Sequence, residues 1–168
     1  QPADWEETVQ ATKALAEYKG PVYFRLGRPK VKAIFDSSYK FEIGKGRIVQ
    51  EGSELVIFAT GIMVQESLVA METLAKENIN VSLVNISTIK PIDRDIVIEQ
   101  TRKHGAILTA EDHNIIGGLG DAVGEVLLDN QISVPFKRVA VNDHFAETGT
   151  GPQLFEKYGL SHNHIVKA

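Results

Sequence analysis

The stretch from Ala106 to Leu127 constrains the fold of this chain more than any other. It contains an apolar run at 106–110, polar residues at 111–114, glycines at 117, 118 and 120, and then apolar residues at helical spacing. A short apolar run is typical of a parallel strand that is covered on both faces, and the change of period across the glycines predicts a helix. We therefore expect one strand-to-helix corner of an α/β sheet, and ligands usually bind in the crevice beyond such corners.

The rest of the chain repeats this alternation of strand and helix. Apolar runs predict strands at 47–49, 55–59, 81–86 and 137–141, while helical spacing predicts helices at 64–78, 93–103, 118–128, 152–158 and 162–167. Strands that alternate with helices favour right-handed crossovers and parallel pairing, and the short loop between the first two strands indicates an antiparallel edge. The prediction is a three-layer α/β/α fold with a mostly parallel five-stranded sheet and one antiparallel edge strand.

The N-terminal residues carry one helix and one strand at most. Asp4 is placed to cap a helix that ends before Gly20-Pro21, and residues 22–24 are expected to form a strand. The expected apolar face of this helix consists of Trp5, Val9, Thr12, Leu15 and Ala16. One helix and one strand cannot make a domain, so we divide the chain into residues 1–35 and 36–168. We expect the first part to be partly disordered or to pack onto another chain.

Composition and charge exclude several classes of protein. The chain has 168 residues, a formal net charge of −4 and no basic stripe, which argues against binding to nucleic acid or to an anionic membrane. It has no cysteine and no apolar run long enough to span a bilayer, so a cytoplasmic location is expected. The chain begins on Gln1 and enters a helix almost at once, from which we expect a longer parent polypeptide.

Five short motifs, in order and at matching spacing, resemble the C-terminal third of transketolase. They are residues 24–29 (FRLGRP), 59–61 (ATG), 88–93 (TIKPID), 107–113 with 117–120 (ILTAEDH and GGLG) and 155–160 (FEKYGL). By this resemblance, residues 1–35 are the end of a pyrimidine-binding domain with its linker, and residues 36–168 are a transketolase C-terminal domain. Deoxyxylulose-phosphate synthase and the beta subunits of thiamine-dependent 2-oxoacid dehydrogenases share this domain, so those reactions remain alternatives.

The resemblance implies thiamine diphosphate chemistry, in which a two-carbon ketol unit moves between sugar phosphates in carbohydrate metabolism, as in the pentose phosphate pathway. In that family a Gly-Asp-Gly motif holds Mg²⁺ and the diphosphate, and a glutamate near the pyrimidine ring activates the cofactor. The resemblance implies that both lie upstream of where this chain begins. We therefore expect thiamine diphosphate and Mg²⁺ to be bound outside this chain, and the chain alone to be inactive. The implied partners are sugar phosphates, an N-terminal transketolase section or subunit, and a second copy in a homodimer.

One functional residue carries over from the family, and it is an arginine. By resemblance, Arg28 contacts the substrate phosphate, and a guanidinium fork matches phosphate oxygens in geometry and charge. A surface arginine or an ion pair at a subunit contact is the alternative. Arg25 has the same chemistry, but we expect it to form a structural ion pair.

Three other features suggest catalysis or ligand binding, and we assign none of them that role. Glu111, Asp112 and His113 are expected in a turn, where neighbouring side chains point apart and serve the turn or a domain contact. The glycines that follow lack dinucleotide-binding spacing and indicate close packing of helix on sheet. His162 and His164 lie two residues apart, which is a poor geometry for a metal pair. A non-catalytic assembly module with the same domain therefore remains an alternative to a transketolase.

Overall fold

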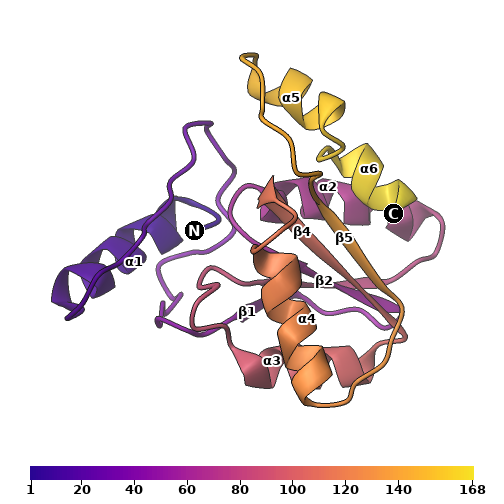
Figure 1. Ribbon diagram of the computed structural model, residues 1–168, viewed down its shortest axis with the longest axis horizontal. Coiled ribbons are helices and arrows are strands. Elements are labelled where there is room, and N and C mark those ends of the chain that lie inside the picture. The colour runs from indigo at the N-terminus through magenta and orange to yellow at the C-terminus, as the bar shows by residue number, and fades with distance from the viewer.

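The computed structural model describes residues 1–168 and contains one five-stranded sheet (Figure 1). The strand order is β1-β3-β2-β4-β5. The strands are Arg47–Gln50 (β1), Leu55–Ala59 (β2), Val81–Asn85 (β3), Ala106–Asn114 (β4) and Phe136–Val141 (β5). β1 runs antiparallel to β3, and all other pairs are parallel. The predicted mostly parallel sheet with one antiparallel edge strand is confirmed.

Helices cover both faces of the sheet, which confirms the three layers (Figure 1). On one face α2 (Met63–Lys76) contacts α6 (His162–Lys167), and α5 (Gly151–Lys157) adds Phe155 to the same core. On the other face α3 (Arg94–Lys103) contacts α4 (Leu119–Asp129). None of the helices combines the length and the apolar character needed to cross a membrane.

The central strand β2 is apolar at every position because helices cover both of its faces. Ile57 and Ala59 point into the core under α2, whereas Val56 and Phe58 point into the core under α3 and α4. All four side chains are at most 1% exposed. Since successive strand residues face opposite sides, a strand with helices on both faces needs apolar residues at every position.

The edge strand β1 pairs with β3 and not with β2, its neighbour in the sequence. The connection between β1 and β2 crosses the start of β3 at Gly52, where a Cβ atom would overlap the backbone of Val81. Gly52 N–H donates to the hydroxyl of Ser82, and Ser53 and Glu54 N–H both donate to the carbonyl of Asn80. Glycine at this crossing lets a short loop place β2 on the far side of β3.

Helix α1 (Trp5–Glu17) lies beside the three layers (Figure 1). Asp4 caps it as predicted, accepting a hydrogen bond from Glu7 N–H. The predicted apolar face is wrong, because the buried helix residues are Glu7 and Ala11, whereas Trp5 is 74% exposed. Burial of Glu7 depends on hydrogen-bond partners far away in the sequence, which a helical hydropathy pattern does not reveal.

Two local predictions are also wrong. Residues 22–24 are extended but pair with no strand, so they form no sheet element. The polar residues 111–114 continue β4 and do not form a turn, with a register irregularity against β5 between Ala110 and Asn114. Strand identity depends on a pairing partner as well as on residue type, and that partner is set by the whole fold.

Candidate functional site

Arg28, the predicted phosphate contact, is exposed on an extended segment that belongs to no helix or strand. Its guanidinium makes no hydrogen bond and no ion pair within the chain. The charge of Arg28 is therefore available to a ligand or to another chain.

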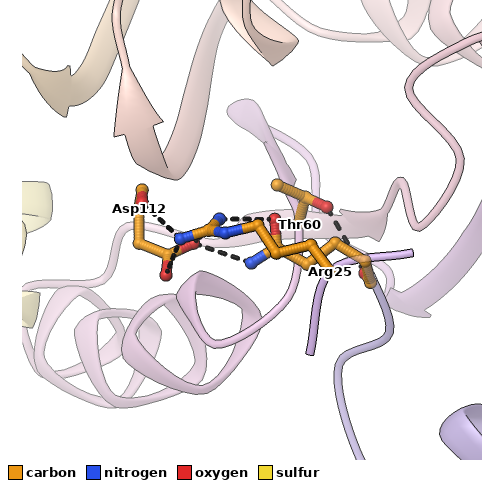
Figure 2. A network of polar contacts seen from close by, with 4 residues as sticks. Arg25, Thr60 and Asp112 are labelled. Atoms are coloured by element: carbon orange, nitrogen blue, oxygen red, sulfur yellow. Dashed lines mark hydrogen bonds and ion pairs between the residues drawn. The ribbon is translucent and has the colours of Figure 1, made fainter. Parts of the chain in front are cut away.

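Arg25, three residues earlier, is fully engaged, and its predicted structural ion pair is confirmed (Figure 2). Its Nη1 donates to Asp112 Oδ1 and Nη2 donates to Asp112 Oδ2, each at 2.9 Å. Nη2 also donates to the Asp112 carbonyl, and Nη1 to Gln1 Oε1, both at 2.9 Å. Four acceptors on two nitrogens leave this guanidinium little capacity for a phosphate.

The Arg25–Asp112 pair closes the crevice where a doubly wound sheet usually holds its ligand. β2 continues into α2 on one face and β4 continues into α4 on the other, so the switch point lies between β2 and β4. The Gln1 side chain fills this point, donating from Nε2 to Asp112 Oδ1 at 2.8 Å. Gly61, at φ +56°, has no room for a Cβ against Gln1. The chain itself thus occupies the crevice.

Glu111 points away from Asp112 and caps helix α4. Its carboxylate accepts hydrogen bonds from Leu119 N–H at 2.8 Å and Gly120 N–H at 2.9 Å, and its side chain is buried. Burial raises the pKa of Glu111 above its ordinary value, and the two amide donors oppose that rise. The helix N-terminus therefore already holds an anion, supplied by the neighbouring strand.

The acidic motif and the glycines contact other parts of this chain, although residues 111–113 lie in β4 and not in the predicted turn. Glu111 faces α4 and Asp112 faces Arg25, so the motif forms no catalytic triad. A Cβ on Gly118 would overlap the Glu111 carboxylate, so the glycine permits the close approach of helix and strand. No group of three or more His, Cys, Asp or Glu side chains gathers closely enough to hold a metal ion.

A cavity of about 500 Å³ lies between the N-terminal segment and the strand ends. α1, residues 18–25, the loop 87–91 and the β4–α4 corner line it, with apolar and polar residues on its walls. Arg28 is not among the lining residues. The cavity therefore marks the junction of the N-terminal segment with the sheet and is not the predicted phosphate site.

Sequence reasoning missed a buried polar cluster that joins α1 to the sheet. The Glu7 carboxylate accepts hydrogen bonds from Tyr39 Oη at 2.6 Å, from Ala3 N–H at 2.8 Å and from Asn85 Nδ2 at 2.9 Å. Glu7 in the first helical turn looked like an ordinary partner of the helix dipole. No local signal links it to Asn85, at the end of β3.

The fold and the site together define a doubly wound α/β domain whose switch-point crevice is occupied by its own chain, with the unpaired Arg28 on the segment that leads out of it. The chain belongs to the transketolase family, since the model for the family described as "Transketolase, C-terminal domain" matches residues 44–165. The chain spans about half the length, 52%, of the first two curated relatives it matches.

Individual relatives agree with the family assignment. The chain is 40% identical over 168 residues to the 6-deoxy-6-sulfo-D-fructose transketolase subunit SqwH of Clostridium sp. strain MSTE9, covering all of this chain and 52% of that protein. It is 37% identical over 161 residues to a 1-deoxy-D-xylulose-5-phosphate synthase of Syntrophotalea carbinolica, covering 95% of this chain and 25% of that one. A solved split-gene transketolase, described as an inactive beta4 tetramer, superposes with a TM-score of 0.93 at 43% identity, over 99% of this chain and 54% of the other.

Proposed function

We propose that this chain is the C-terminal part of a thiamine-diphosphate-dependent transketolase, which transfers a two-carbon ketol unit from a ketose phosphate to an aldose phosphate. Membership of the transketolase family supports the proposal. So does the similarity over the whole chain to a protein named as a transketolase subunit and to a split-gene transketolase structure. The reaction belongs to carbohydrate metabolism, and we place it in the cytoplasm.

Within that enzyme, this chain contributes Arg28, which binds the phosphate of the sugar substrate. The observation that carries this assignment is the contrast between two arginines three residues apart. Arg25 is saturated by Asp112 and Gln1, while Arg28 is exposed and has no partner. A free guanidinium on a segment anchored beside the strand ends fits a dianionic phosphate.

The residues of this chain do not fit the cofactor. Mg²⁺ and a diphosphate need several convergent oxygen ligands, and no cluster of three acidic or histidine side chains exists here. The two carboxylates at the end of β4 are committed to α4 and to Arg25. We therefore assign the binding of thiamine diphosphate and Mg²⁺ to the rest of the enzyme.

The proposed partners are an N-terminal transketolase section or subunit and a second copy of this chain in a homodimer. Six of the ten exposed large hydrophobic residues lie between Trp5 and Val31, which favours a protein partner for that segment. The similar split-gene structure, an inactive beta4 tetramer, supports both self-association and inactivity of such chains alone. We keep the division into residues 1–35 and 36–168 as part of this proposal.

A second reaction is favoured by one specific relative. Similarity to a 1-deoxy-D-xylulose-5-phosphate synthase over 95% of this chain fits the same domain in an enzyme with a different product. Product analysis separates the two reactions. Exchange between ketose and aldose phosphates supports transketolase, and formation of a deoxyketose phosphate supports the synthase.

The test of the phosphate contact is Arg28→Ala in the complete enzyme. Loss of a charge-assisted bidentate contact should cost about 1.5–3 kcal/mol, which is roughly a ten- to hundredfold rise in KM for a phosphorylated ketose. KM for the same ketose without phosphate should not change. Steady-state kinetics with both substrates measures this difference.

Arg102→Ala is the matched control, because Arg102 is also exposed but lies on α3, in another part of the fold. We expect it to leave both KM values unchanged. An equal loss for phosphorylated and unphosphorylated ketoses in Arg28→Ala would refute the assignment of Arg28.

A further inference from the structure

The segment that carries Arg28 is held to the rest of the chain by a single side chain. Between Lys19 and Val31 there is no helix or strand, and no backbone N–H or C=O makes a backbone hydrogen bond. The four hydrogen bonds of Arg25 to Asp112 and Gln1 are the only ones in this stretch. A segment without backbone hydrogen bonds depends on such side-chain contacts for its position.

The acceptor of these bonds, Asp112, lies in β4 between two positions that are paired with β5, Ala110 and Asn114. The pairing of β4 with β2 ends at Ala110. The adjacent residue Glu111 is fixed by the N-terminus of α4. The side chains of Arg25 and Asp112 are 30% and 18% exposed, so the pair is partly shielded from water. The Arg25–Asp112 pair thus attaches to β4 a segment that has no backbone hydrogen bonds of its own.

Arg28 follows the attached residue, Arg25, by only three positions in the chain. Three residues of extended chain span at most about 11 Å. Fixing Arg25 therefore limits where the Arg28 guanidinium can be. Because a bidentate contact between guanidinium and phosphate depends on its geometry, a displaced Arg28 would bind the phosphate more weakly.

We propose that the Arg25–Asp112 ion pair positions Arg28 for the sugar phosphate, which makes Arg25 and Asp112 positioning residues for substrate recognition. The inference rests on the proposed role of Arg28 and adds two residues that do not themselves contact substrate. It assigns a function in the complete enzyme to Asp112, at the end of β4.

The test is Asp112→Asn in the complete enzyme, with a ketose phosphate and the same ketose without phosphate as substrates. The substitution removes the charge and one guanidinium acceptor but keeps the shape. We expect KM for the phosphorylated ketose to rise roughly tenfold, by no more than Arg28→Ala produces, with kcat unchanged. KM for the unphosphorylated ketose should not change. A purely structural role would lower kcat for both substrates.

Two further variants sharpen the result. Asp129→Asn is the matched control, because Asp129 pairs with Arg94 at the same 2.9 Å but at the far end of α4. It should leave both KM values unaltered. If Asp112→Asn does not assemble, Arg25→Lys retains the charge while losing the planar fork, and the same selective rise in KM is expected.

A double-mutant cycle decides whether Asp112 acts through Arg28. In an Arg28→Ala background, Asp112→Asn should add no further rise in KM for the phosphorylated ketose. Additive effects, or no effect of Asp112→Asn while Arg28→Ala discriminates, would overturn the positioning role and leave the phosphate contact standing. If Arg28→Ala itself does not discriminate, the phosphate contact fails and the positioning role fails with it.

Discussion

At the scale of single residues, Glu7 shows how one buried charge fixes the N-terminal segment on the sheet. Its carboxylate is fully buried. It accepts hydrogen bonds from Ala3 before the helix, from Tyr39 in the linker and from Asn85 at the end of β3. Burial and then the Glu7 carboxylate raise the pKa of the Tyr39 hydroxyl, so Tyr39 remains a donor. Loss of any acceptor here leaves buried donors without partners.

We predict that Glu7→Gln lowers the free energy of unfolding of this chain by about 1–3 kcal/mol, because an amide NH₂ would then face the donors of its neighbours. Glu6→Gln, one residue away on the less buried side of α1, should change it by less than about 0.5 kcal/mol. Urea unfolding of both variants makes the comparison. Equal stability of the two variants would show that the Glu7 cluster does not hold α1 to the sheet.

At the scale of elements, the start of α4 is fitted to the end of β4. The carboxylate of Glu111 caps the helix, and the absence of a side chain at Gly118 leaves room for that carboxylate. Gly124, inside the same helix, lies under no such restriction, since a Cβ there would be 3.7 Å from the Phe136 ring. Two glycines of one helix thus have different reasons to be glycine.

Alanine substitutions at these two positions should therefore change stability in opposite directions. Gly118→Ala forces the Glu111 carboxylate out of place and should destabilise the chain by about 1–3 kcal/mol. Gly124→Ala should stabilise it by about 0.5–1 kcal/mol, because alanine favours a helix interior over glycine. Thermal and denaturant unfolding measure both effects. Destabilisation of similar size at both positions would contradict the capping geometry.

Elements with a strong local period were predictable from the sequence, and those that depend on distant partners were not. The apolar run of β2 and the helical spacing of α2 and α4 reflect burial against whatever lies opposite. The extension of β4 through Asn114, the pairing of β1 with β3 and the buried face of α1 all depend on distant residues. The same division holds at the site, where the Arg25 ion pair was expected but its partner was not.

At the scale of the whole molecule, the chain consists of a doubly wound domain and an N-terminal segment that is bound to it through polar contacts and through Ala3, Ile34 and Phe35 in the apolar core. Asp4 and Glu7 hold α1 and the linker, and Arg25 holds the segment before Arg28. Six large apolar side chains of the same segment, Trp5 and Tyr23 among them, are exposed. This arrangement suits a section that meets the rest of an enzyme through its N-terminal residues.

In the proposed enzyme, this chain supplies a substrate contact and the rest of the protein holds the cofactor. The most direct test is a coupled ketol-transfer assay with thiamine diphosphate and Mg²⁺, run on the rigorously purified chain alone and on the complete enzyme that contains it. We predict no turnover by the chain alone and ketol transfer between sugar phosphates by the complete enzyme. Turnover by the chain alone, or a complete protein without transfer, would contradict the account.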